Sequence, residues 1–245
     1  MTNRLFFPAL ALLAASAQAT LLVEERFAYG DGTNLLGTAP NALGVASYEY
    51  GGWGWQGAVG GGNFADPLGG ADSTKDYYTT GGALRINLSS AVPATDGTTL
   101  HGSFNAVCWS NPTYGWLEFG NLRIGRNGGS TDWSIQDKTG GAAVLTGDPS
   151  WNGTFLQFSI DFLPGNDVVK LWVSPNVSGP LGVPDAVLSN RDLVGFSSIL
   201  FGCDNGTSVD NIRLGTAPES VGAVPEPASV AVLGLALAAF RRRRA

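Results

Sequence analysis

Charged side chains are scarce in this sequence: they make up only 14% of its 245 residues, against about 25% in an ordinary soluble domain. Helical periodicity is missing too, because no apolar repeat of 3.6 residues continues over three turns between residues 20 and 224. Long surface helices need a charged face and such a repeat. The two absences therefore argue against a helical domain.

Positive charge is the scarcer of the two signs in the body of the chain. Residues 20–224 contain nine Lys or Arg and nineteen Asp or Glu, which gives this segment a net charge of about −10. An acidic surface repels the phosphates of nucleic acid. We therefore expect no nucleic-acid partner.

Side chains for common enzyme chemistry are also few. His101 is the only histidine, it stands in the loop-like stretch Thr-Leu-His-Gly, and no Cys/His cluster lies near it in the sequence. A general base or a metal ligand usually needs partner groups, so we expect His101 to be a surface or strand-end residue. The Gly-x-Ser-x-Gly signature of serine hydrolases is absent. The sequence predicts no catalytic residue and no cofactor.

Glycine, in contrast, is abundant, with 35 residues, about twice the usual ~7%. Together with many Asn, Ser and Thr residues it favours turns between short strands. Several segments have the composition or the alternation of strands. They are Val23–Tyr29, Ser47–Tyr50, Leu84–Leu88, Ser103–Trp109, Tyr114–Ile124, Trp133–Gln136 and Val209–Gly215.

The clearest local pattern is a hairpin. Apolar and polar residues alternate from Phe158 to Phe162, the turn residues Pro-Gly-Asn-Asp follow, and a second β-rich run extends from Val168 to Val173. Two such runs around a short turn cluster are typical of a β-hairpin. About ten short strands in one chain favour closure into two packed sheets, which also protects the strand edges.

Three stretches, ERFAYGDGTNLLG, FSIDFLPGNDVVKLWVSP and SVDNIRLG, resemble the concanavalin A-like lectin/glucanase jelly roll, and most of all its laminin-G-like forms in exported bacterial proteins. The resemblance implies an all-β fold, a two-sheet antiparallel jelly-roll sandwich, which we place at residues 20–216. It also implies that the first and last strands lie close together, consistent with the apolar pairs Phe27/Tyr29 and Ile212/Leu214. One fold hosts many activities, so the resemblance does not assign one.

Glucanases of this architecture use a Glu-x-Asp-x-x-Glu run on one strand, whose alternate residues place two carboxylates at one glycosidic bond. This sequence lacks the run: Glu118 has no acid two residues on, and residues 155–162 contain only Asp161. Glu24 and Glu25 are adjacent, so we expect them to point to opposite faces. We therefore predict a non-enzymatic body, with a glycoside hydrolase or lyase of non-standard site as the alternative.

Oxygen-rich turns raise the question of calcium. Jelly-roll lectins often hold Ca²⁺ with Asp and Asn oxygens, and the sequence has Asp204-Asn205-Gly206 and Asp210-Asn211. Turn chemistry accounts for these residues without a metal. We predict no metal site and keep calcium as the alternative.

Seven tryptophans are the most suggestive feature of the body. Trp53 and Trp55 stand in Gly-Gly-Trp-Gly-Trp-Gln, which puts two indoles on one face of an extended segment. Aromatic faces bind sugars, so these two residues are candidate glycan contacts; ordinary core or loop packing is the alternative. Trp116 and Trp172 lie within hydrophobic runs and are expected to fill the core.

The amino terminus has the layout of a secretory signal. Arg4 precedes an apolar stretch, and Ala17-Gln18-Ala19 supplies the small residues that signal peptidase requires. We expect residues 1–19 to be a signal peptide that is cleaved after Ala19.

An exported chain would bring Cys108 and Cys203 into an oxidising compartment. A disulfide between them would close a long loop and contribute about 4–5 kcal/mol. Each cysteine also lies in an apolar, strand-like run, where a thiol packs as a small hydrophobe. The sequence leaves both alternatives open.

The carboxyl terminus reads VPEPASVAVLGLALAAFRRRRA over residues 224–245. Pro225-Glu226-Pro227 holds an extended segment before the apolar run Ala228–Phe240. As a helix this run is about 20 Å long, short for a bilayer core of about 30 Å. Four consecutive arginines would mark its cytoplasmic end. They are Arg241, Arg242, Arg243 and Arg244.

This order of elements resembles the PEP-CTERM sorting domain. The resemblance implies a membrane-embedded exosortase that recognises Pro225-Glu226-Pro227 and removes the tail, after a linker at residues 217–223. We therefore expect an exported protein that contacts the membrane through its C-terminal helix before processing and then reaches the cell surface or extracellular matrix. Glycan binding is its candidate activity, and extracellular polysaccharide is its candidate partner.

Overall fold

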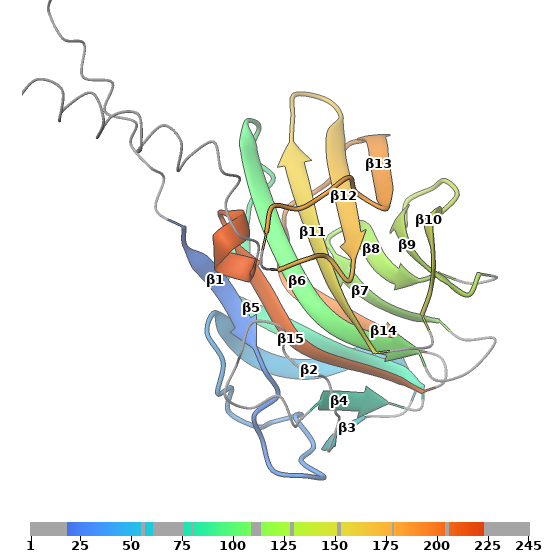
Figure 1. Ribbon diagram of the computed structural model, residues 1–245. Coiled ribbons are helices and arrows are strands. Elements are labelled where there is room, and N and C mark those ends of the chain that lie inside the picture. The colour runs from blue at the N-terminus through green and yellow to red at the C-terminus, as the bar shows by residue number, and fades with distance from the viewer. Residues whose placement is uncertain are drawn as a thin grey trace, which may run out of the picture.

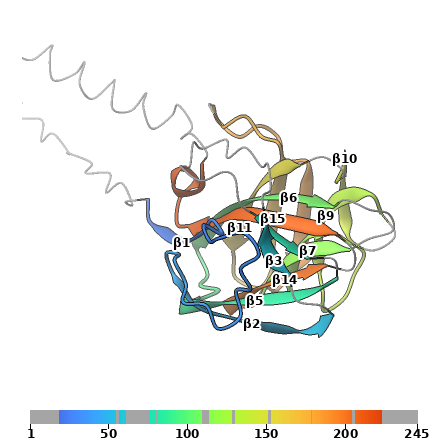
Figure 2. The same ribbon diagram turned by 90° about the horizontal axis from the view of Figure 1, so that it is seen from below.

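The computed structural model of the protein (Figure 1) describes residues 19–54, 57–60, 76–79, 81–108, 114–127, 130–150, 153–177, 179–203 and 206–222. These residues form an all-β, two-sheet antiparallel jelly-roll sandwich, whose two layers are seen edge-on in Figure 2. The described part contains one short 3₁₀-helix and no α-helix. The predicted signal helix and C-terminal helix lie outside the described residues.

Sheet A has eight strands. In spatial order they are β13 (Ala186–Arg191), β12 (Asp167–Val173), β11 (Thr154–Phe162), β6 (Thr98–Cys108), β15 (Thr207–Gly215), β4 (Asp76–Thr79) and β3 (Ala58–Gly60), and β1 (Leu21–Glu25) also pairs with β15.

Sheet B has seven strands. In spatial order they are β10 (Val144–Pro149), β9 (Asp132–Asp137), β8 (Leu122–Arg126), β7 (Gly115–Phe119), β14 (Phe196–Cys203), β5 (Gly82–Val92) and β2 (Val45–Gly54).

The core lies between the sheets and is built from alternate strand residues. Leu84, Ile86 and Leu88 of β5 enter it, as their alternation predicts. Phe119 of sheet B and Phe158 of sheet A meet across it with ring centroids 4.9 Å apart. Because successive strand residues point to opposite faces, Arg85 and Asn87 of β5 are directed outward.

The first and last strands pair, as expected from the jelly-roll resemblance. Glu24 of β1 is opposite Arg213 of β15, and the Arg213 Nε donates to Glu24 Oε1 at 3.0 Å. At the end of the pair the Thr20 amide donates to Thr216 Oγ1, and the Thr216 amide donates to the Thr20 carbonyl, both at 3.0 Å. The two ends of the sandwich therefore leave from one edge (Figure 1).

The strand predictions hold in part. The predicted hairpin is present as β11–β12. The segment Tyr114–Ile124, expected as one strand, is the hairpin β7–β8 instead, because Gly120 turns the chain with a φ of 65°. The first predicted strand ends at Glu25 rather than Tyr29, since Phe27 has a φ of 51°.

A loop that we call the strap, described at residues 174–177 and 179–185, crosses in front of sheet A (Figure 1). The Trp172 indole donates to the Gly182 carbonyl at 2.9 Å, and the Val173 amide donates to Asp185 Oδ2 at 2.7 Å. The 3₁₀-helix η1 (Pro218–Val221) packs on β15 and β6 with Val221 fully buried. The strap and η1 thus cover part of sheet A, whereas the outer face of sheet B has a groove.

Candidate functional site

The outer face of sheet B, directed away from sheet A, has a row of charged residues. Cross-strand partners in a sheet share a face, so the registers of six neighbouring strands define the row. In order from β9 to β2, its members are Gln136, Arg123, Glu118, Leu200, Arg85 and Glu49.

Glu118 is the centre of this row. Its Oε1 accepts from Arg123 at 2.6 Å and its Oε2 from Lys138 at 2.7 Å. Burial would raise the pKa of this carboxyl, but the hydrogen bonds from Lys138 and Arg123 outweigh burial and hold the pKa below its ordinary value. Glu118 is therefore an ionised, neutralised carboxylate at pH 7 and has no proton to give as a general acid.

Trp116 belongs to a neighbouring row of the same sheet, in which its cross-strand partners are glycines. Its register neighbours are Gly125 and Gly202, and a Cβ on Gly202 would come within 2.8 Å of the indole. The Arg123 guanidinium stacks over the ring at 4.1 Å from its centroid, and Tyr114 meets it edge-on. The indole therefore forms part of the outer face of sheet B, and the prediction that it fills the core is wrong.

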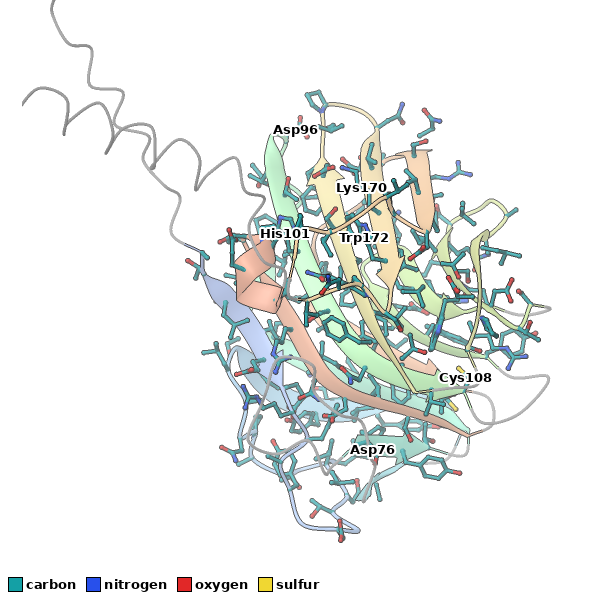
Figure 3. All side chains as sticks on the ribbon, viewed as in Figure 1. Asp76, Asp96, His101, Cys108, Lys170 and Trp172 are labelled. Carbon is teal, nitrogen blue, oxygen red and sulfur yellow. The ribbon has the colours of Figure 1, made fainter. Side chains whose placement is uncertain are left out.

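Trp172 is also outside the core. It is buried, but it sits opposite Gln157 on the outer face of sheet A, beneath the strap (Figure 3). The hydrophobic runs containing Trp116 and Trp172 misled the prediction, because each run also supplies an outward-facing position.

Hydroxyl and amide groups form a third row on sheet B. Ser198, Asn87 and Ser47 are cross-strand partners, and the Asn87 amide donates to Ser47 Oγ at 2.9 Å. Arg85 reaches from the charged row to Ser198 Oγ at 3.2 Å.

A groove of about 240 Å³ opens over the charged row and the hydroxyl row. Its polar lining comes from Arg85, Glu118, Lys138, Ser197 and Ser198. A larger cavity, of about 440 Å³, lies at the edge between β1 and the end of β5. That cavity is lined mainly by apolar side chains and has no charged residue, so we take the groove as the candidate site.

The acids that the sequence singled out are not brought together. Glu24 pairs with Arg26 and Arg213, whereas Glu25 is buried and accepts from the Phe27 amide and the Tyr48 hydroxyl. The two glutamates thus have separate surroundings, as their adjacency predicts. Asp161 is on sheet A, where it binds Lys170 at 2.8 Å.

His101 lies in the first half of β6 and is partly buried, so the loop-like stretch that contains it is part of a strand. Burial lowers its pKa, opposed by Asp161 and Glu219 and assisted by Lys170, and the net shift is downward. The imidazole is therefore neutral at pH 7. Its direct cross-strand partners are Ser159 and Gly215.

Buried polar groups collect on the outer face of sheet A. Gln157 and Ser103 are opposite each other on β11 and β6, and both are 0% exposed. Within the described part of the chain, the two amide atoms of Gln157 and the Ser103 hydroxyl have no hydrogen-bond partner.

The cysteines are present as two buried thiols in opposite sheets. The Thr207 hydroxyl donates to Cys108 Sγ at 3.7 Å, and the Cys203 thiol donates to the Thr79 carbonyl at 3.4 Å. Burial raises the pKa of Cys108 to about 11. The two thiols are thus free in this structure, and thiol labelling of the exported protein tests the disulfide alternative.

Among the described residues no group of three or more His, Cys, Asp or Glu could hold a metal ion. Asp204 and Asn205 lie outside the described residues. Asp210 is buried, with Oδ1 accepting from the Asn211 amide and Oδ2 from its side chain. The fold therefore uses the Asp210 oxygens to hold a bulge in β15.

The candidate glycan contacts at the edge of sheet B are placed only in part. The backbone of Trp53 belongs to the edge strand β2, while its side chain and all of Trp55 lie outside the described residues. The shared face of the two indoles stays a prediction.

We call the predicted signal peptide at residues 1–19 and the sorting tail at residues 224–245 the two address segments. Their candidate residues lie almost entirely outside the described residues, which begin at Ala19 and end at Gly222. Those outside are Ala17, Pro225, Glu226, Pro227, Arg241, Arg242, Arg243 and Arg244. Their roles in cleavage, sorting and membrane stop stay predictions. Within the described part, no helix is long and apolar enough to cross a membrane.

The fold and the groove define an antiparallel jelly-roll domain with a charged and hydroxyl-rich outer face. Residues 223–245 match the PEP-CTERM protein-sorting motif. The chain therefore carries this motif at its carboxyl end, and the motif indicates export and cell-surface sorting. A comparison with curated protein sequences finds no match.

Solved structures with a similar course of the chain include a lectin and two binding domains. The Lotus tetragonolobus seed lectin is 12% identical, with a TM-score of 0.37, and the match covers 79% of this chain and 94% of the lectin. The CBM2 module of the evolved Dit of Lactobacillus casei phage J-1 is 10% identical, with a TM-score of 0.41 and coverage of 81% and 96%. The botulinum neurotoxin serotype D binding domain is 14% identical, with a TM-score of 0.42; the match covers 80% of this chain but only 48% of that one.

The sequence pointed to the right sheet positions without identifying the site. Alternation around β5 already directs Arg85 and Asn87 outward. The sequence does not reveal the cross-strand register that brings Arg85, Glu118 and Lys138 to one groove, because these residues come from three separate segments of the chain.

Proposed function

We propose that this chain is an exported, surface- or matrix-targeted, non-enzymatic protein that binds glycans in the groove on the outer face of sheet B. The sorting motif at residues 223–245 supports the targeting. The observation that carries the binding proposal is the groove itself, where charged side chains stand beside serine hydroxyls. Saccharides present hydroxyl groups that need such donors and acceptors.

The arrangement favours binding over hydrolysis. Glycosidases need two carboxyl groups about 5–9.5 Å apart, one of them protonated. Glu118 is the only acid among the described residues that line the groove, and its lowered pKa keeps it ionised. A polysaccharide-active enzyme remains the alternative activity, and it requires a second carboxyl group from outside this lining.

During export the proposed partners are signal peptidase, acting after Ala19, and an exosortase that reads Pro225-Glu226-Pro227. The C-terminal apolar segment holds the chain in the membrane until processing. Because Thr20 and Thr216 are hydrogen-bonded to each other, both address segments start from the same edge of the sandwich.

Blocking the groove tests the binding proposal. Leu200→Trp places a large side chain in the groove lining, and Val187→Trp adds the same bulk at an exposed position of β13 on the other sheet. We expect the exported protein, isolated from producing cells, to bind members of a polysaccharide panel. Leu200→Trp should weaken that binding at least about tenfold, and Val187→Trp should leave it unchanged.

Thermal unfolding of both variants serves as the check of folding. The proposal fails if the parent protein binds no saccharide of the panel, or if the two folded variants bind equally well.

A further inference from the structure

The groove on sheet B has a positively charged lining, although the body of the chain is acidic. Residues 20–224 have nineteen acidic and nine basic residues, but the described groove lining contains Arg85 and Lys138 with Glu118 as its only acid. Arg123 lies next to Glu118 in the same row. Three of the nine cations are therefore gathered on one face with two carboxylates, Glu118 in the groove lining and Glu49 opposite Arg85 on β2.

Glu118 does not neutralise all of the positive charge around it. Glu118 accepts one bond from Arg123 and one from Lys138, so these three side chains together have a net positive charge. Arg85 forms no ion pair within the described residues, and its guanidinium bonds only the neutral hydroxyl of Ser198 there. An arginine has five N–H donors in a planar fork, so Arg85 keeps donors for a ligand.

This donor set fits a particular chemistry. Arginine forks bind carboxylates through two parallel hydrogen bonds, and Lys138 adds an ammonium group to the same lining. Ser197 and Ser198 supply hydroxyl partners from β14, which lies between β5, the strand of Arg85, and β7, the strand of Glu118. A sugar ring with a carboxylate would use both kinds of group at once.

We propose that the groove binds an anionic polysaccharide, with the carboxylate of an acidic sugar residue held by Arg85 and Lys138. This inference rests on the proposed glycan binding and names its ligand class. The acidic body of the chain repels a polyanion at long range, so the positive charge of the groove has to outweigh this repulsion where the sugar carboxylate is bound.

Polygalacturonate and its methyl ester test the inference, because the ester keeps the sugar chain and removes the charge. Dextran is the neutral reference. We expect the exported protein to bind polygalacturonate, to bind the ester at least about tenfold more weakly, and to lose polygalacturonate binding as salt is raised from 50 to about 500 mM.

Two substitutions with the same charge change separate the groove from the overall charge. Arg85→Gln removes one of the two cations that line the groove, and Lys170→Gln removes a cation that pairs with Asp161 on sheet A. We expect about tenfold weaker polygalacturonate binding for Arg85→Gln and parental binding for Lys170→Gln. Lys138 also lines the groove, so Lys138→Gln serves as the test variant if Arg85→Gln does not fold.

The outcomes distinguish the two proposals. Equal binding of polygalacturonate and its ester, or equal loss in the Arg85 and Lys170 variants, overturns the anionic preference. Binding of dextran alone overturns it as well while leaving glycan binding intact. Absence of binding to all three polymers overturns both.

Discussion

Glu24 and Glu25 are neighbours in β1, yet their surroundings shift their pKa values in opposite directions. Burial would raise the pKa of Glu24, but hydrogen bonds from Arg26 and Arg213 outweigh it and lower the pKa below 4.5. Burial dominates at Glu25 and raises its pKa above 4.5, against hydrogen bonds from Tyr48 and the Phe27 amide. The sequence predicted the opposite facing of these residues but not this contrast, which depends on distant partners.

The contrast predicts a pH signature for two single substitutions. A carboxyl group whose pKa is raised in the folded protein stabilises the fold fully below pH 4.5, and this stability is lost as the pH rises through the folded pKa. A carboxyl group whose pKa is lowered stabilises the fold above pH 4.5, and this stability is lost as the pH falls through the folded pKa. From pH 4 to pH 7, Glu25→Gln should therefore gain unfolding free energy relative to the parent, and Glu24→Gln should lose it.

Urea unfolding at the two pH values measures both changes. A difference from the parent that is the same at pH 4 and pH 7 for either variant would contradict the assigned surroundings.

At the scale of elements, the alternation of apolar and polar residues predicted strands correctly where one face of the strand is buried and the other is polar. It located β5 and the β11–β12 hairpin correctly. It failed at Tyr114–Ile124, where apolar residues continue through the Gly120 turn and hide the boundary between β7 and β8. It also failed for the site, because the cross-strand registers of β5, β7 and β14 are set by packing of the whole sandwich.

Cys108 and Cys203 belong to β6 and β14, in opposite sheets, and each thiol has its own hydrogen-bond partner. We expect two thiols per chain when the exported protein is denatured and labelled without a reductant. The native protein should label slowly, because burial raises the pKa of Cys108 to about 11 and leaves little thiolate at pH 7. Denatured protein that takes no label would show a disulfide instead.

The edge strand β2 carries the other candidate glycan contacts. Trp53 belongs to this strand by its backbone, and Trp55 follows it in the sequence. If both indoles contact sugar, the double substitution Trp53→Ala/Trp55→Ala should weaken glycan binding by about tenfold or more, as loss of two aromatic anchors does. A double variant that retains parental binding on a glycan array would reject the contact, and Val187→Trp again controls for an unrelated surface change.

At the scale of the whole molecule, both chain ends leave the sandwich at the β1–β15 edge. The sequence identified each address segment from its own residues, since signal and sorting motifs are local patterns. Their common exit became visible only from the pairing of β1 with β15. This geometry suits a domain whose two terminal segments are both processed at a membrane.

Processing at both ends has a direct readout in mass. Protein released from the cell surface should begin at Thr20 and lack the arginine tail, because signal peptidase and exosortase are expected to remove the flanking segments. Intact-mass measurement checks both ends at once. A released chain that retains Arg241, Arg242, Arg243 and Arg244 would contradict processing.

The central claim is that saccharide binds the outer face of sheet B. Hydrogen–deuterium exchange of the exported protein, with and without bound polysaccharide, tests it most directly. We predict added protection in β5, β7, β14 and the loop before β14, and unchanged exchange in the strap and β11–β12. Protection confined to the strap and sheet A would contradict the claim.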